Sequence, residues 1–150
     1  LECQGLYPDR KKSFFIAGLS SFLIGHIFYI VALARLASIT FLQPLIAVVL
    51  FILILPLEKI FRINLGKMKL PIYLYAAIIS VMVAFAVGAV AYAPSVLTKL
   101  ILVAAILFFI SDALLAYIYF GPKNIYPMRA MNLGCYYLAQ ILFAISILLR

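Results

Sequence analysis

Charged residues, and acids above all, are scarce in this sequence. Only 11% of the 150 residues are charged, and four Asp and Glu stand against twelve Lys and Arg. Hydrophobic residues make up 69% of the chain and the mean hydropathy is +1.26, whereas soluble domains are about half apolar. This composition excludes a water-soluble globular domain, and it predicts a membrane protein.

Cysteine and histidine are nearly absent as well. The chain has two cysteines, Cys3 and Cys135, and a single histidine, His26. These residues do not have the spacing of metal ligands, and two such cysteines do not make a disulfide framework. We therefore expect no metal and no other cofactor, and we expect Cys135 to be a small packing residue.

Long apolar runs are what the sequence has in abundance. A helix needs about 20 residues at 1.5 Å per residue to cross a hydrocarbon core of about 30 Å. Five segments meet this need, at 13–34, 38–57, 70–93, 98–120 and 131–149. They predict an all-α fold, a polytopic transmembrane helical bundle that forms a single domain over 1–150. Pro44, inside the second segment, is expected to kink that helix or to mark a short interfacial stretch.

The basic residues of the predicted loops divide unequally between the two sides of the membrane. One side holds Arg10, Lys11, Lys12, Lys59, Arg62, Lys67, Lys69, Lys123 and Arg129, and the other side holds Arg35, Lys99 and Arg150. The positive-inside rule places the first side in the cytoplasm, with the C-terminus outside. Because anionic headgroups account for the net charge of +8, no nucleic-acid partner is expected.

Asp112 is the only acidic residue within the predicted spans, in the segment FFISDALLAYIYF. It lies about eight residues from the expected cytoplasmic end, roughly 12 Å deep at helical rise. Ionisable groups at such depth usually face a bundle interior or a water-filled cavity. Desolvation favours the protonated carboxyl group, which suits a general acid; the alternative is an Asp that only bonds a neighbouring helix. The residues on the same helical stripe are Ala105, Phe108, Leu115, Ala116 and Tyr119.

The segment SFLIGHIFYIVALAR places His26 and Tyr29 one helical turn apart on a face that also holds Phe22. A neutral imidazole donates at one nitrogen and accepts at the other, so His26 suits proton transfer in a cavity and equally suits an interhelical hydrogen bond. The adjoining face has only small residues, which we expect to let a neighbouring helix approach closely: Gly18, Ser21, Gly25 and Ala32.

The last span carries Tyr136, Tyr137 and Gln140 within about one helical turn. Tyrosines are common in the aromatic belts of membrane proteins, but Gln140 lies near mid-span, too deep for a belt. These three residues are therefore expected to share a polar pocket.

Three short segments together carry a family resemblance. They are GLSSFLIGHIFYI at 18–30, FFISDALLA at 108–116 and YYLAQILFAIS at 136–146. In this order they resemble signatures of the YhhN family of lysoplasmalogenases, multi-pass proteins of bacterial and animal membranes. The resemblance runs over most of the chain, and it implies a multi-pass protein of the bacterial cytoplasmic (inner) membrane.

The chain also departs from the family pattern. Members of the family usually have eight helices and carry a Gly-Asp-x-x-Leu motif just before a segment like ECQGLYPDRKK, whereas this sequence begins at Leu1, where that motif would end. The resemblance therefore implies an N-terminally truncated fragment without the second intramembrane acid, and it puts the activity of the chain alone in question.

The resemblance implies hydrolysis of the vinyl-ether bond of lysoplasmalogens to a fatty aldehyde and glycerophosphoethanolamine or glycerophosphocholine. Enol ethers hydrolyse by proton transfer to the β-carbon and capture of the oxocarbenium ion by water, which requires an acid and a base but no metal. The residues assigned on this basis are Asp112 and His26 as catalytic, with Tyr29, Tyr137, Gln140 and Ser111 binding substrate. The expected partners are the lysophospholipid substrate, with Lys123 or Arg129 near its phosphate, and membrane lipids.

Two other classes of function also fit the residues. A small transporter or proton-conducting bundle uses buried Asp and His as well, and it would show discontinuous helices or a water route open to both faces. A non-catalytic scaffold subunit would hold Asp112 in a tight interhelical bond with no cavity beside it.

Overall fold

A chain this apolar has to satisfy its backbone hydrogen bonds internally, and in hydrocarbon helices do so within one segment. The computed structural model describes residues 8–36, 38–122 and 126–149, and these residues contain helices and turns but no strand. The long helices are α1 (Pro8–Ala34), α2 (Leu42–Ile54), α4 (Lys69–Tyr92), α5 (Val96–Phe120) and α6 (Tyr126–Leu148), with two short ones, α3 (Leu57–Ile60) and the 3-10 helix η1 (Gly66–Met68). The predicted all-α class is confirmed.

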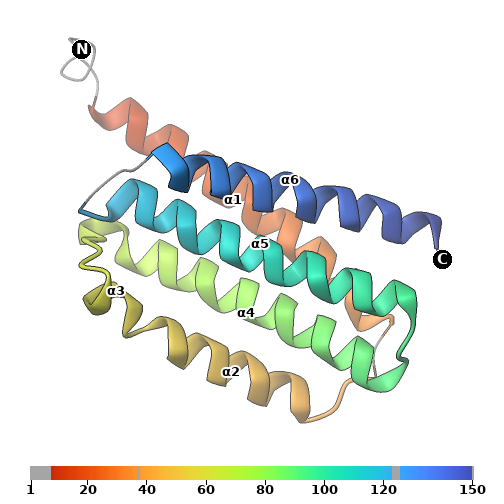
Figure 1. The fold of residues 1–150 in the computed structure, drawn as a ribbon. Helices are drawn as coiled ribbons and strands as arrows, with labels where there is room; N and C mark the ends of the chain where they lie inside the picture. The colour runs from red at the N-terminus through yellow and green to blue at the C-terminus, as the bar shows by residue number, and fades with distance from the viewer. Residues whose placement is uncertain (1–7, 37, 123–125, 150) are drawn as a thin grey trace.

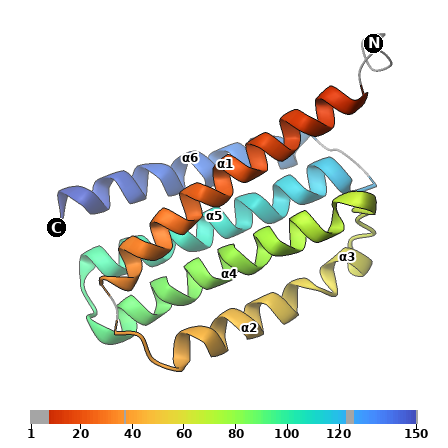
Figure 2. The same cartoon turned by 180° about the vertical axis from the view of Figure 1, so that it is seen from behind.

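Four of the long helices lie side by side in one layer, in the order α6, α5, α4, α2 (Figure 1). Helix α1 crosses one face of this layer obliquely, as the view from behind shows (Figure 2). The buried core lies where α1 meets the layer, and its largest enclosed apolar side chains are Met82 of α4 and Phe108 of α5. Side chains of α4, α5 and α6 that face α1 can therefore lie close together where α1 crosses the layer.

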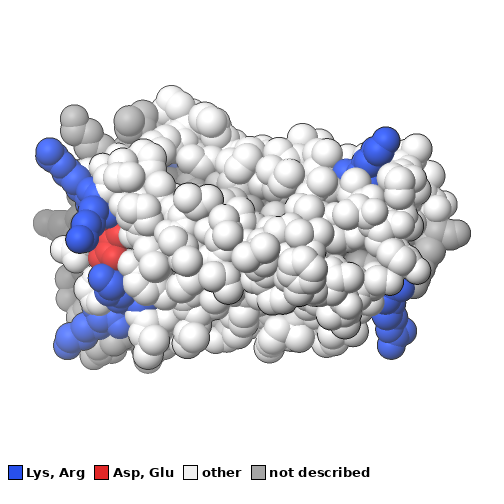
Figure 3. Space-filling view, turned by 90° about the horizontal axis from the view of Figure 1, so that it is seen from below, with Lys and Arg blue, Asp and Glu red and all other residues white. Residues whose placement is uncertain are grey.

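Among the described residues, five helical segments are long and apolar enough to cross a membrane, in agreement with the five predicted spans. They are Ile16–Ala34, Leu42–Ile60, Gly66–Tyr92, Val96–Phe120 and Tyr126–Leu148. Lysine and arginine gather at the two ends of the molecule and leave an uncharged surface between them (Figure 3). Of the residues singled out above, Leu1, Cys3, Lys123 and Arg150 lie outside the described part of the chain.

The second span differs from its prediction in where proline acts. Helix α2 begins at Leu42, so Pro44 lies in its first turn, where a backbone N–H has no intrahelical acceptor and its loss causes no kink. The interruption comes at Pro56 instead, between the end of α2 at Ile54 and the start of α3. Proline breaks a helix there because its ring clashes with the preceding turn and it lacks a donor.

A capping box at Ser95 fixes the tight turn between α4 and α5. The Ser95 hydroxyl accepts a hydrogen bond from Thr98 N at 3.1 Å, and Thr98 Oγ1 accepts one from Ser95 N at 2.9 Å. Thr98 Oγ1 also donates to the Ala93 carbonyl at 2.9 Å. These bonds satisfy donors at the start of α5 and set how α4 and α5 lie against each other.

A buried glutamine fixes the start of α2 against α4. The Gln43 amide oxygen accepts hydrogen bonds from Thr40 N at 2.9 Å and Thr40 Oγ1 at 2.8 Å, and Nε2 donates to the Ser38 carbonyl at 2.7 Å. The side chain lies against Gly88 so closely that a Cβ there would be 2.5 Å from Nε2. Gly88 is therefore required by packing.

We expect Gly88→Ala to lower the free energy of unfolding by about 1–3 kcal/mol, because the added methyl group displaces Gln43 and its three hydrogen bonds. Gly134→Ala on α6 is the matched control, since a Cβ there meets nothing within 4 Å. Equilibrium unfolding in mixed micelles measures both variants. Equal free energies of unfolding for Gly88→Ala and Gly134→Ala would contradict the close packing of Gln43 on Gly88.

Candidate functional site

The α4–α5 hairpin brings a tyrosine to the intramembrane acid. Tyr75 lies 19 residues before Pro94 and Asp112 lies 18 residues after it, so antiparallel packing places them at the same depth. The Tyr75 hydroxyl donates a hydrogen bond to Asp112 Oδ2 at 2.7 Å. Tyr75 is buried, and the Asp112 side chain is 10% exposed. The carboxyl group therefore has one fixed donor from a neighbouring helix.

Helix α1 adds the histidine from the other side. His26 Nε2 lies 3.8 Å from Asp112 Oδ2, and the His26 side chain is only 1% exposed. The other ring nitrogen, Nδ1, lies 2.7 Å from the Phe22 carbonyl oxygen, one turn earlier on the same helix. Because a carbonyl only accepts, Nδ1 carries the proton and a neutral ring leaves the Nε2 lone pair directed toward Asp112.

His26 Nε2 is the only buried side-chain nitrogen or oxygen without a hydrogen-bond partner in the described residues. Burying such an acceptor unpaired costs free energy, so it marks a place where a partner is to be expected. The rings of Phe108 and Tyr75 hold the imidazole edge-on, with centroids 4.8 and 5.3 Å away. The ring is thus held in place while Nε2 stays available.

A cavity of about 230 Å³ opens beside the carboxyl group, between α1, α4 and α5. Its polar lining residues are Asp112, Tyr75 and Tyr119, and the rest are apolar or glycine: Gly18, Leu19, Phe22, Ile72, Leu115, Ala116 and Phe120. Leu115, Ala116 and Tyr119 belong to the stripe predicted to share the face of Asp112. The cavity can hold an apolar molecule whose polar atoms meet Asp112.

A second cavity, also of about 230 Å³, lies on the other side of His26 and is lined by His26, Tyr29 and Gln140. Tyr29 donates a hydrogen bond to Gln140 Oε1 at 3.2 Å and stacks on Phe143, with centroids 4.3 Å apart. His26 therefore lies next to two groups of polar residues, Asp112 with Tyr75 and Tyr29 with Gln140. Gln140 does not line the cavity of Asp112.

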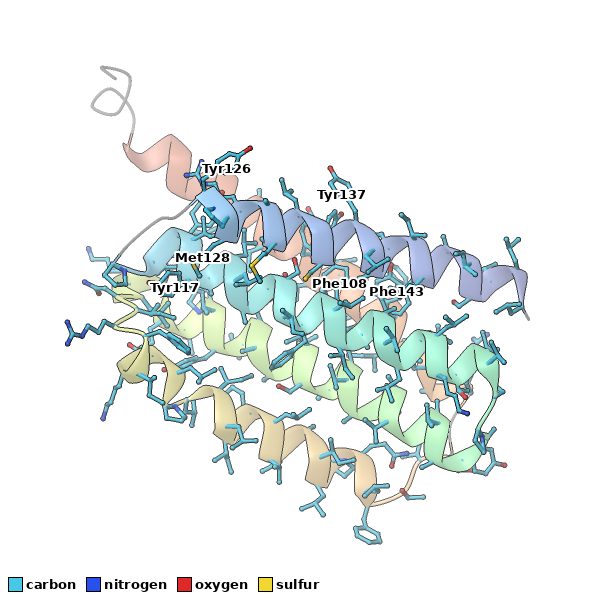
Figure 4. All side chains as sticks on the ribbon, viewed as in Figure 1. Phe108, Tyr117, Tyr126, Met128, Tyr137 and Phe143 are labelled. Atoms are coloured by element: carbon cyan, nitrogen blue, oxygen red, sulfur yellow. The ribbon has the colours of Figure 1, made fainter. Side chains whose placement is uncertain are left out.

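The structure separates two predicted substrate-binding residues from this site. Tyr137 is 60% exposed and points away from the bundle (Figure 4), because its neighbour Tyr136 takes the inward position beside Phe108. Ser111 faces α6, where Asn132 Nδ2 donates to its carbonyl at 2.7 Å and to its hydroxyl at 2.9 Å. Adjacent residues of a helix point in directions about 100° apart. Tyr137 therefore cannot face inward together with Tyr136, and Ser111 cannot face the site together with Asp112.

The small residues of α1 also differ from their prediction. A Cβ at Gly18 or Gly25 would meet nothing within 4 Å among the described residues, so no helix there packs closely on this face. Gly18 instead leaves space at the wall of the Asp112 cavity. Arg129, the other predicted phosphate contact, is exposed in the first turns of α6.

The comparison with protein families gives one match, to the YhhN family over residues 6–147. The chain belongs to the YhhN family. No curated protein and no solved structure matches it. The matched region of this YhhN-family chain contains all three helices that form the site, α1, α4 and α5.

Tyr75 is the site residue that sequence reasoning missed. Tyrosines in a span are usually assigned to packing or to an aromatic belt, and Tyr75 carries no signature of its own. Tyr75 and Asp112 lie nearly the same number of residues before and after Pro94, and this spacing is the signal that would have identified Tyr75.

We expect the contact between Tyr75 and Asp112 to appear in a double-mutant cycle. Tyr75→Phe and Asp112→Leu each remove one partner, and their coupling in the free energy of unfolding should be about 0.5–3 kcal/mol. Tyr92→Phe is the control partner, because Tyr92 is 64% exposed at the far end of α4. A coupling free energy no larger than that of the control pair would contradict this hydrogen bond.

Proposed function

We propose that the protein hydrolyses the vinyl-ether bond of lysoplasmalogens, releasing a fatty aldehyde and glycerophosphoethanolamine or glycerophosphocholine. Lysoplasmalogenase is the known activity of the YhhN family. The observation that carries the proposal is the Asp112 carboxyl group, which lines a mostly apolar cavity and lies 3.8 Å from the unpartnered Nε2 of His26 behind it.

The first step is proton transfer from the Asp112 carboxyl group to the β-carbon of the enol ether. The carbon–carbon double bond supplies the electron pair, and the product is an oxocarbenium ion next to the Asp112 carboxylate. General acid catalysis of this kind requires a carboxyl group that holds its proton until substrate is bound, which burial favours. The Tyr75 hydroxyl stabilises the resulting carboxylate through the bond to Oδ2.

The second step is attack of water on the oxocarbenium carbon. His26 Nε2 accepts the proton of that water, since Nδ1 already donates to Phe22 and holds the ring in the right tautomer. The hemiacetal then collapses to aldehyde as the glycerol oxygen leaves with a proton. A small side-chain movement would join His26 Nε2 to Asp112 in a direct hydrogen bond and return the acid to its starting state.

A single-chain lipid suits the cavity because its walls are apolar except at Asp112 and two tyrosines, Tyr75 and Tyr119. Its phosphate would lie toward one of the basic ends of the bundle, and we propose that the end with the α3–η1 loop faces the cytoplasm of a bacterial cell. Tyr29 and Gln140 would bind water or substrate on the far side of His26.

The cavity also bears on the alternative classes of function. A scaffold subunit would have Asp112 in an interhelical bond without open space, whereas Asp112 here bonds Tyr75 and also lines a cavity. A transporter would place a discontinuous helix at the binding site. The interrupted segment of α2 and α3 does not line the Asp112 cavity, and this supports the hydrolase.

Asp112→Asn should abolish aldehyde release from a lysoplasmalogen, by the about 10²–10⁴-fold typical of general acid catalysis, because an amide cannot give up the proton. His26→Gln should lose less, since it still positions water. The assay uses the protein purified in detergent, with size-exclusion profiles as the folding control. Turnover near that of the wild type in Asp112→Asn would exclude Asp112 from the chemistry.

Gly18→Leu tests whether the cavity is the substrate site. The longer side chain enters the cavity without displacing packed atoms, so kcat/KM should fall by about tenfold or more while the unfolding midpoint stays unchanged. Gly134→Leu is the matched control, because Gly134 also has free space but lies on α6 and lines neither cavity of the site. Equal kinetics of the two variants would place the substrate elsewhere.

A further inference from the structure

A larger cavity, of about 400 Å³, lies among α2, α3, α4 and α5, with one residue from the start of α6, at the end of the bundle that carries the α3–η1 loop. Its volume falls in the range of about 300–1,000 Å³ typical of small-molecule sites. Apolar side chains make up almost all of its wall, including Tyr117 and Met128, both labelled at that end in Figure 4. No residue of α1 lines it, and it adjoins the cavity of Asp112, with which it shares Ile72 and Ala116 as lining residues.

One acidic side chain lines this otherwise apolar cavity. Glu58 accepts hydrogen bonds from Lys69 Nζ, 2.9 Å from Oε2 and 3.3 Å from Oε1, and from the Tyr73 hydroxyl. The Lys69 ammonium also lies 5.5 Å from the centroid of the Tyr73 ring. A carboxylate and an aromatic ring therefore hold a primary ammonium group at the polar end of an apolar cavity.

We propose that this cavity binds an ethanolamine glycerophospholipid of the surrounding bilayer. One hydrocarbon chain fills the cavity, and the ethanolamine ammonium takes the place of the Lys69 ammonium between Glu58 and Tyr73. Lys69 turns outward and pairs with the lipid phosphate. The exchange replaces the pair of Glu58 and Lys69 by two pairs with the lipid, because the zwitterionic headgroup supplies one charge of each sign.

The exposure of the pair favours this exchange. The side chains of Lys69 and Glu58 are 54% and 22% exposed, and such pairs contribute little to stability, so that opening one costs little. A primary ammonium offers three N–H donors to a carboxylate, whereas choline offers none and a glycerol headgroup carries no positive charge. Glu58 thus selects for ethanolamine at a membrane end where the exposed Lys59, Arg62 and Lys67 attract any anionic lipid.

Native mass spectrometry of the detergent-purified protein, titrated with dioleoyl phosphatidylethanolamine, phosphatidylcholine or phosphatidylglycerol, tests the proposal. We expect one phosphatidylethanolamine to bind about tenfold more tightly than either other lipid. In Glu58→Gln, the affinity for phosphatidylethanolamine should fall to the affinity for the other two lipids. Ala113→Phe, which narrows the cavity from an exposed position on α5, should weaken all three lipids. Ala113→Leu replaces that variant if Ala113→Phe aggregates.

Lys59→Gln is the control, because it makes a charge-to-amide change at the exposed neighbour of Glu58, which does not line the cavity, and it should bind phosphatidylethanolamine as the wild type does. The readout is binding, so the outcome does not depend on whether the protein hydrolyses lysoplasmalogens. Equal affinity for the three lipids would overturn the proposal, as would wild-type binding of phosphatidylethanolamine by Glu58→Gln or by both Ala113 variants.

Discussion

The hydrogen bond from Tyr75 to Asp112 is the contact on which the candidate site depends. A carboxyl group in the hydrocarbon region is costly unless it has a partner, and the donor has to come from a neighbouring helix at the same depth. The capped turn after α4 supplies this match, because it lies almost equally far from the two residues. A shift of one residue between α4 and α5 would rotate Tyr75 away by about 100°.

The bilayer explains the features that would be anomalous in a soluble protein. Large apolar side chains are exposed along α1 and α2, for example Phe28 at 70% and Leu53 at 60%, and hydrocarbon is the solvent that they suit. His26, Tyr75 and Asp112 are largely buried inside the bundle. Helix α1 crosses the layer of the other helices on this side (Figure 2). Because α1 crosses obliquely, one of its faces reaches α4, α5 and α6 in turn. His26 meets Asp112, and Tyr29 meets Gln140 one turn later.

Much of the fold was predictable because membrane spans follow from length and composition. The five spans and the position of His26 inside the bundle agree with the sequence-based predictions. What failed was rotation about the helix axis: Tyr137 and Ser111 belong to the right segments but face away from the site. Runs that are apolar on every side give no amphipathic signal, so only packing decides which face turns inward. Tyr75 was missed for the same reason.

The account rests on a neutral His26 whose bare Nε2 faces a protonated Asp112. Because His26 is the only histidine in the sequence, ¹⁵N-histidine labelling gives one ring to observe by NMR in detergent or lipid. At neutral pH we expect a proton on Nδ1, none on Nε2, and an Nε2 signal that shifts in Asp112→Asn while the Nδ1 signal stays in place. A ring protonated on Nε2, or an Nε2 signal insensitive to Asp112, would contradict the account.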